Sequence, residues 1–459
     1  MRRLLSTLTP LALALALTGC ISLAPEYQRP SAPLPAALPA TDAAATQPAL
    51  RSLLRDERLY RVVQLALQNN RDLRVSLLNV EKSQAQLRLA DADRWPTVSA
   101  ALIGTRSPNT AGKEVNSFQG GLQLSSYELD LFGRVRNASE AASATLLGTE
   151  AAARTARLSL ATQTASAWLT LAADTEQLAL ARATQASRAE TLRLTVLRER
   201  VGAAGTLELR AAQGLLASAQ ASVAQLERQL AQDRNALELL VGAAVPADAL
   251  PAADTTLAGA DWLAAVPPGL SAEVLLARPD VVQAEQALRA ANANIGVARA
   301  AMFPRITLSG SAGEVSDSLA GVFSAGHFAY TITGSALVTL FDAGRNQANV
   351  RVSEINRDQA VASYEKAVQT AYREAADALV AQDAWRRQVS AQQALLTAEQ
   401  DRLRLTRLKH EAGAASLGDL LDAERSLASV QQALVQVRLA EWLNRLSLYK
   451  ALGGGEFAA

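Results

Sequence analysis

Residues Arg278 to Gly310 read RPDVVQAEQALRAANANIGVARAAMFPRITLSG, a polar, Ala-rich run that ends at Phe303-Pro304. Alanine carries the lowest helix penalty, so the run predicts a long helix. Proline disfavours helical geometry in the residue before it and cannot continue the hydrogen-bond ladder. The alternating stretch from Ile306 therefore predicts a strand, and the whole segment predicts a helix that passes into a strand at Phe303-Pro304.

The chain contains an earlier copy of this segment, 208 positions upstream. The matched pairs are Asp280 with Asp72, Ala293 with Ala85, Ala298 with Ala90, Phe303-Pro304 with Trp95-Pro96, and Ile306 with Val98. A helix, a stop made of an aromatic residue and proline, and a strand thus occur twice in the same order. This pattern indicates an internal duplication.

Two long helical hairpins support the duplication. We expect helices over 137–200 and 345–410, with glycine-marked turns leading to return helices that end near Gly242 and before Gly453. The first return helix has apolar residues at alternating steps of three and four, with Asp233 as the one polar member of ten. Adding 211 to each position reproduces the seam, with Asn444 at the place of Asp233.

Each copy also predicts a pair of strands. In the first copy, alternation around 98–102 and again from Phe118 to Leu131-Phe132 predicts a hairpin with a long polar loop. In the second copy, Ser318 to Phe341 carries no charge and has the length of a membrane-spanning helix. Its period of two from Phe328 to Leu340 and its interrupting glycines favour a strand over that alternative.

The composition excludes several classes of protein. The 459 residues carry a net charge of +1, which gives no footprint for nucleic acid. His327 and His410 are the only histidines, so a histidine-rich metal site is not expected. No nucleophile elbow, phosphate-binding loop, dinucleotide fingerprint or zinc spacing occurs. We therefore predict no enzyme activity and no cofactor.

The N-terminus has the features of a secretory signal, with Arg2-Arg3 followed by an apolar run and small residues. It ends in Leu17-Thr18-Gly19-Cys20, which resembles a bacterial lipoprotein lipobox. That resemblance implies cleavage before Cys20, a covalent lipid such as palmitate on Cys20, and outer-membrane sorting because Ile21 follows the cysteine. A signal peptide with a chance cysteine is the alternative.

The predicted organisation follows from these boundaries. We expect a signal peptide at 1–19, a lipidated, Pro-rich tether at 20–55, a first repeat at 56–242, a linker at 243–269, a second repeat at 270–453 and a tail at 454–459. The composition of the tether cannot pack a core.

Four strands per chain cannot close a membrane barrel, because open sheet edges leave backbone groups unsatisfied in lipid and known barrels have roughly eight strands or more. Two chains would give a narrow lumen filled by side chains. Three chains would give twelve strands and room for an aqueous pore. The fold class predicted is therefore mainly α, internally duplicated, with a long helical periplasmic barrel and a membrane β-barrel portion completed by a homotrimer.

Several short motifs resemble those of the outer-membrane factor, or TolC-like, family of tripartite efflux systems. They are Arg278-Pro279-Asp280, Ala298 to Pro304, Tyr127 to Arg134, Leu340 to Arg345 and Leu421-Asp422-Ala423-Glu424. With the lipobox they resemble the lipoprotein branch that serves resistance-nodulation-division pumps. The resemblance implies a trimeric outer-membrane exit duct for drugs or other toxic compounds. It also implies a periplasmic adaptor, an inner-membrane pump and outer-membrane lipid as partners.

The resemblance places a closed periplasmic end at the turn of the second helical hairpin. It assigns acidic rings to Asp419 and Asp422, which lie three positions apart on one helix face. Candidate gate neighbours are Gly418, Leu417, which could supply an apolar constriction, and Glu208 at the first copy's matching place. The alternative is that these acids lie on a solvent-exposed helix face near the N-terminus, where the helix dipole favours negative charge.

Other charged and aromatic residues have both a functional and a structural interpretation. Four basic residues precede the two turns: Arg198, Arg200, Arg407 and Lys409. They could pair with acids to hold a closed state, or they could interact favourably with the negative ends of the helix dipoles. We predict helix–strand joints at Trp95, Pro96, Phe303, Pro304, Gly133, Arg134, Gly344 and Arg345. Trp95, Phe303 and Tyr330 are candidates for the membrane interface, with structural packing as the equal alternative.

Two other functions compete with the efflux duct. One is the outer-membrane duct of a type I protein secretion system, which shares the fold. The other is a non-conducting periplasmic coiled-coil scaffold, which would not need the amphipathic hairpins.

Overall fold

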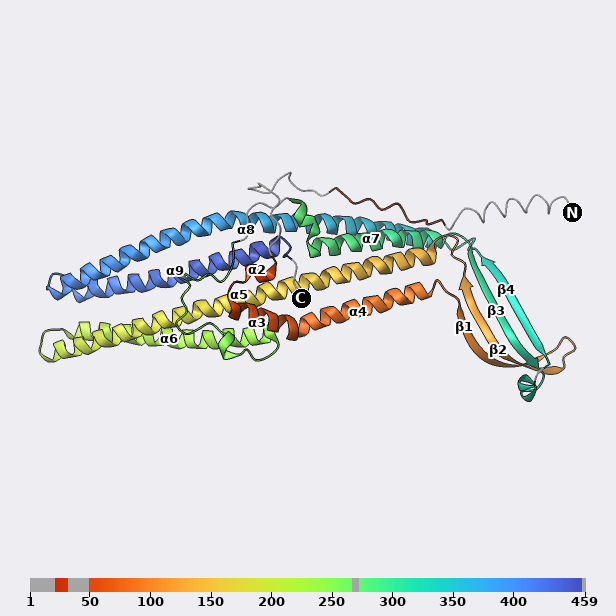
Figure 1. The fold of residues 1–459 in the computed structure, drawn as a ribbon, viewed down its shortest axis with the longest axis horizontal. Coiled ribbons are helices and arrows are strands. Elements are labelled where there is room, and N and C mark those ends of the chain that lie inside the picture. Colours follow the sequence, from red (N-terminus) through yellow and green to blue (C-terminus); the bar gives the residue numbers. More distant parts are fainter. Residues whose placement is uncertain (1–20, 32–48, 266–271, 325, 456–459) are drawn as a thin grey trace. The chain divides into compact units, whose positions relative to one another are not determined.

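The computed structural model describes residues 21–31, 49–265, 272–324 and 326–455 (Figure 1). Cys20, most of the expected tether and the last four residues lie outside this range. In the described part, no helix combines the length and apolar character needed to cross a bilayer.

The first copy contains two strands between helices. After α2 (Leu50–Leu53), its elements are α3 (Glu57–Asn69), α4 (Arg71–Ala92), β1 (Thr97–Pro108), β2 (Glu114–Glu128), α5 (Arg134–Arg200) and α6 (Thr206–Val241). Asn70 separates α3 from α4. The Asn70 side chain accepts from the Leu73 backbone N–H at 2.8 Å and donates to the Leu240 carbonyl, also at 2.8 Å.

The second copy repeats this order, which confirms the predicted duplication. Following the short 3-10 helix η1 (Ala247–Ala249), its elements are η2 (Ala272–Ala277), α7 (Pro279–Ala300), β3 (Arg305–Ser316), η3 (Ala320–Phe323), β4 (Phe328–Leu337), α8 (Arg345–Glu411) and α9 (Leu417–Ala451). α4 and α7 both have 22 residues, and α5 and α8 both have 67.

The four strands form one antiparallel sheet in the order β1-β2-β3-β4 (Figure 1). The disputed segment 318–341 forms η3 and β4, which favours the strand interpretation. Both second strands end earlier than expected: β2 stops at Glu128 and β4 at Leu337. Leu129 still donates to the Ile306 carbonyl at 2.9 Å, and a glycine with positive φ, Gly133 or Gly344, stands directly before the next helix in each copy.

Close backbone approach fixes the middle of the sheet. Gly121 and Gly313 are register partners on β2 and β3. A Cβ atom on Gly121 would overlap the carbonyl oxygen of Ala312. A bulge between Leu124 and Tyr127, where Ser126 has φ 23°, then shifts the register.

The chain forms two compact units. The first comprises the sheet, residues 21–31, 78–151 and 282–366, and packs α5 on α7 through Ala141, Ala144, Ala290 and Ala293. The second comprises 49–77, 152–281 and 367–455 within the described range. Its core includes Trp262, whose ring contacts those of Trp168 and Trp442.

Candidate functional site

The helix-to-strand joint is built in the same way in both copies. α4 ends before Trp95-Pro96 and β1 begins directly after it, while α7 ends before Phe303-Pro304 and β3 begins directly after that. Trp95 is 75% exposed, whereas Phe303 stacks on Phe132 with ring centroids 4.8 Å apart. The two aromatic residues thus occupy equivalent positions in the repeat but differ in their packing.

The strand-to-helix joint uses glycine and aspartate in both copies. Gly133 and Gly344 have φ of 73° and 82°, a left-handed conformation that glycine adopts without a Cβ penalty. Asp130 accepts from the Arg136 backbone N–H at 2.7 Å, and Asp342 accepts from the Asn346 backbone N–H at 2.8 Å. These carboxylates satisfy free amides at the start of α5 and α8.

Glu128 connects the joint between β2 and α5 to the joint between α7 and β3. Arg134 donates to its two carboxylate oxygens at 2.7 and 2.8 Å, and Arg305 forms an ion pair with it at 2.7 Å. A cavity of about 350 Å³ adjoins this contact and is lined by Phe132, Arg134, Phe303 and Pro304, among others. The structure therefore brings together three of the predicted joint residues, Arg134, Phe303 and Pro304. Gly344 and Arg345 form the equivalent start of α8.

At the second helical turn, Asp419 caps α9. Its carboxylate accepts from the Ser416 backbone N–H at 2.9 Å, and the Ser416 hydroxyl accepts in return from the Asp419 N–H at 3.1 Å. Hydrogen bonds from the Ser416 side chain and backbone lower the pKa of Asp419 below its ordinary value. Asp419 is therefore ionised at neutral pH while serving as a cap.

The other predicted turn residues are placed separately. Asp422, one turn further along α9, forms an ion pair with Arg425. Leu417 is half-buried, whereas Gly418 and Glu208 are exposed. Glu208 lies in the first turn of α6. Asp419 and Asp422 thus lie one turn apart on the same face of α9. Asp419 is bonded to Ser416, and Asp422 is paired with Arg425.

A buried ion pair near this turn joins α5 to α9. Arg188 Nη1 lies 2.9 Å from Glu424 Oε2, and the two side chains are 6% and 11% exposed. The pair lacks hydrogen-bond geometry, so it is a charge contact only. Arg407 of α8 approaches the same carboxylate at 3.7 Å. One of the arginines expected to pair with acids therefore does so.

Sequence reasoning missed Arg188. It also gave Glu424 no role, although Glu424 stands within a motif that resembles the family. No local pattern marks Arg188, because its burial depends on α5 packing against a helix more than 200 positions away.

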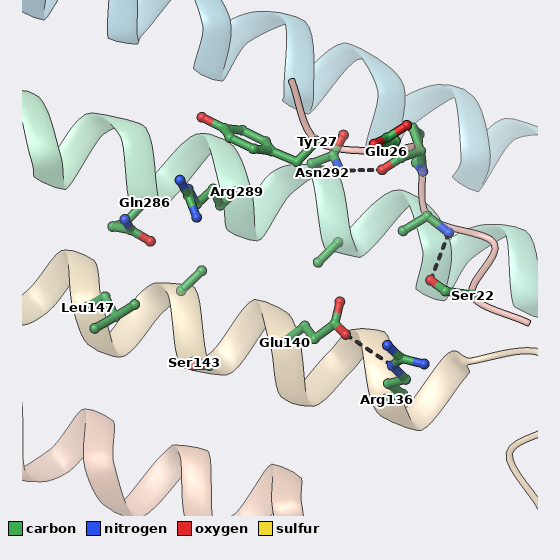
Figure 2. A pocket seen from close by; sticks show the side chains of 14 residues that line it. Ser22, Glu26, Tyr27, Arg136, Glu140, Ser143, Leu147, Gln286, Arg289 and Asn292 are labelled. Atoms are coloured by element: carbon green, nitrogen blue, oxygen red, sulfur yellow. Dashed lines mark hydrogen bonds and ion pairs between the residues drawn. The ribbon is translucent and has the colours of Figure 1, made fainter. Parts of the chain in front are cut away.

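Residues 21–31, here called the N-terminal strap, pack on the first unit. Figure 2 shows the strap running against α7, where Asn292 donates to the Pro25 carbonyl at 2.8 Å. Ser22 donates to Asn137 at 2.8 Å, and Tyr27 donates to Glu285 at 3.3 Å. A cavity of about 480 Å³ lies below the strap.

The prediction of an unpacked tether is thus wrong for the strap. Asn292 and Arg299 of α7 donate to the carbonyls of Pro25 and Leu23. The side chains of Tyr27 and Arg29 both contact the buried Glu285. Although burial raises the pKa of Glu285, Arg289 and Arg29 lower it overall. The first fold contacts also precede Asp56, since Leu53 and Leu54 are fully buried.

The described residues contain no group of three or more His, Cys, Asp or Glu side chains that could hold a metal ion. Their polar clusters include helix caps, ion pairs and the strap contacts. These polar contacts hold helices and strands in place relative to their neighbours.

The repeated joint and paired helical hairpins agree with a known protein family. The sequence model described as outer membrane efflux protein matches residues 62–243 and 270–454, one match for each copy. The chain belongs to this outer membrane efflux protein family.

Named relatives extend over nearly the whole chain. The probable efflux pump outer membrane protein TtgC of Pseudomonas putida is 38% identical over 98% of this chain and 96% of its own length. The cation efflux system protein CusC of Escherichia coli is also 38% identical, over 98% of this chain and 99% of its own length.

Solved structures share the fold. A membrane protein from Pseudomonas aeruginosa matches with a TM-score of 0.88 and 38% identity, covering 95% of this chain and 98% of that one. The open state of the MtrE outer membrane channel of Neisseria gonorrhoeae matches with a TM-score of 0.86 and 34% identity, covering 95% of this chain and 100% of that one.

Proposed function

We propose that three copies of this chain form the outer-membrane exit duct of a tripartite efflux pump. The observation that carries the proposal is a four-stranded sheet whose outer strands β1 and β4 each have one neighbour within the described chain, with long helices continuing from it. Unpaired strand edges are costly in lipid, so the sheet must be closed by other copies. Three sheets give a twelve-stranded barrel with an open lumen.

The partners follow from the class of assembly. A periplasmic adaptor and an inner-membrane resistance-nodulation-division pump would deliver substrate to the duct. Relatives with closely similar identities are named for antibiotic, toluene and cation efflux. This range supports a duct that conducts what its pump supplies rather than selecting one substrate.

The lipid anchor is a second part of the proposal. Lipidation of Cys20 would attach the chain to the outer membrane immediately before the strap. The strap's contacts with α5 and α7 support this, because they would hold the anchor at the end of the helices next to the sheet.

Asp419 and Asp422 would form acidic rings in the trimer, one ring per residue, and these would favour cations in the lumen. The capping role of Asp419 and the ring role are compatible. A capping carboxylate keeps its charge while its helix presents it at the turn.

Planar lipid bilayers test both the duct and its rings. The purified full chain should conduct. The variant Asp419→Asn with Asp422→Asn should reduce preference for cations and weaken block by multivalent cations, because two charges per chain are removed while an acceptor for Ser416 remains. The control Ser416→Ala removes the cap and keeps both charges, so its cation preference should match the wild type.

Absence of conductance in well-folded trimers would refute the duct and favour a scaffold. Unchanged cation preference and block in the double variant would refute the acidic rings alone.

A further inference from the structure

His410 joins the two helical turns of one chain. It lies in the last turn of α8, five positions before Ala415, and it is half-buried. Its Nδ1 lies 2.9 Å from the Ala415 carbonyl oxygen, and its Nε2 lies 3.3 Å from Nη1 of Arg198. Arg198 belongs to the last turn of α5, so this contact connects the first helical hairpin to the second.

The two partners determine where the imidazole proton sits. A carbonyl oxygen can only accept, so Nδ1 must carry hydrogen and donate to Ala415. A guanidinium can only donate, so Nε2 must present its lone pair to Arg198. The observed contacts therefore need neutral His410 with its proton on Nδ1.

We propose that His410 is an acid-sensitive connection between the α5 and α8 turns, closed when the imidazole is neutral and released when it gains a proton. The proposal rests on the proposed duct, because these turns are where its periplasmic end would lie. Protonation places hydrogen on both ring nitrogens, which removes the acceptor for Arg198 and sets two positive charges against each other.

Among the described residues, the charged groups that the neighbouring helices bring close to this turn are already engaged. Arg198 faces His410 from α5, and Arg407 precedes it on α8 but is directed to Glu424 of α9. Glu424 is already paired with buried Arg188. Asp419 is held by Ser416, and its lowered pKa keeps it ionised throughout the range in which histidines titrate.

Bilayer recordings at about pH 7.5 and about pH 5.5 test the connection, since histidine charge changes between these values. Acidification should raise the open fraction of wild-type channels by about three- to tenfold, as expected for the loss of one part-exposed contact. His410→Gln stays neutral and keeps an acceptor, so its response should be lost. His410→Lys should be open at about pH 7.5 to the extent that the wild type is open at about pH 5.5. The matched control His327→Gln changes the other histidine and should respond as the wild type does.

A second measurement does not depend on conduction. With only two histidines in the chain, nitrogen NMR of histidine-labelled protein in bilayers can be assigned by comparison with His410→Gln. The neutral ring of His410 should be the Nδ1–H tautomer, and the doubly protonated ring should appear over the same pH range in which the open fraction rises.

An Nε2–H tautomer near neutral pH, or an undiminished acid response in His410→Gln, would overturn the proposal. Channels that conduct at neither pH would count against the duct itself. In that case the tautomer would still decide whether the connection exists.

Discussion

At the scale of single residues, Asp174 and Asp233 form a buried acid pair in the first helical hairpin. Asp174 is 8% exposed, and burial, followed by the hydrogen bond and charge of Asp233, raises its pKa to about 7. Asp233 accepts from Gln229 through Oδ1 at 3.0 Å, and its buried Oδ2 has no donor among the described residues. A proton shared between the two carboxyl groups supplies that donor.

The pair predicts a stability that falls as pH rises. Because folding raises the pKa of Asp174 above the unfolded value of 3.8, the folded state binds an extra proton between these values. The stabilisation is fully present below the unfolded pKa and is lost as pH rises through about 7. The thermal midpoint of the purified protein should therefore be higher at about pH 5.5 than at about pH 8.5.

Asp233→Asn should weaken this dependence, because it removes the charge of Asp233 and its amide can donate to ionised Asp174, while the effect of burial remains. In the second copy Asn444 stands at the position that matches Asp233, and it donates to the Ala378 backbone carbonyl at 3.0 Å, so an amide is accommodated there. Asp254→Asn, an exposed acid, is the control and should keep the wild-type slope. A variant at Asp233 with an unchanged slope would exclude the shared proton.

At the scale of elements, local residue chemistry predicted where helices and strands begin and end. Proline after an aromatic residue placed β1 and β3, and glycine placed the ends of α6 and α9 within a few residues. Contacts between distant segments could not be predicted, because a local sequence pattern does not indicate which distant segment a residue will pack against. The strap on α7, the Arg188–Glu424 pair and the packing of the linker belong to this group.

The linker between the copies is held by a tryptophan cluster. Trp262 is 6% exposed. Its ring centroid lies 5.3 Å from that of Trp168, which it meets edge-on, and 6.0 Å from that of Trp442. Its carbonyl accepts from the Arg55 N–H at 2.8 Å. The segment expected only to join two repeats therefore packs into the second unit.

Trp262→Ala should lower the free energy of unfolding by about 3–5 kcal/mol, because it leaves a cavity among large rings. The midpoint of denaturation, followed by far-ultraviolet circular dichroism, measures this change. Trp95→Ala removes a mostly exposed ring and should cost less than about 1 kcal/mol. Equal losses in the two variants would contradict a structural role for the cluster.

At the scale of the whole molecule, the sheet explains why one chain is incomplete. The backbone N–H and C=O groups at the two outer strands of the sheet would be unsatisfied in lipid. Folding of the strands and assembly of the trimer are therefore expected to occur together. The sequence predicted the count of four strands, and the count led to the trimer. It did not predict the close approach of β2 and β3 at Gly121 and Gly313, which requires the register.

Gly121→Ala should reduce the yield of assembled trimer, because its methyl group would overlap the β3 backbone at Ala312 and displace the strand pair. Size-exclusion chromatography with light scattering of outer-membrane extracts measures the yield. Gly334→Ala is the control, since a Cβ atom there meets nothing within 4 Å. Trimer yields that do not differ between the variants would show that the sheet tolerates the displacement.

The two helical turns, although copies of one ancestral loop, are closed differently. α9 starts with the reciprocal Ser416–Asp419 cap, whereas α6 starts at Gly205 without a side-chain cap. Glycine is itself a favoured residue at a helix start, so the two starts differ in stability by only about a few tenths of a kcal/mol. What differs is the lock: side chains fix the backbone of the second turn, whereas the first turn is held by its backbone alone. The two copies have thus diverged at their turns while keeping the lengths of the helices that lead into them.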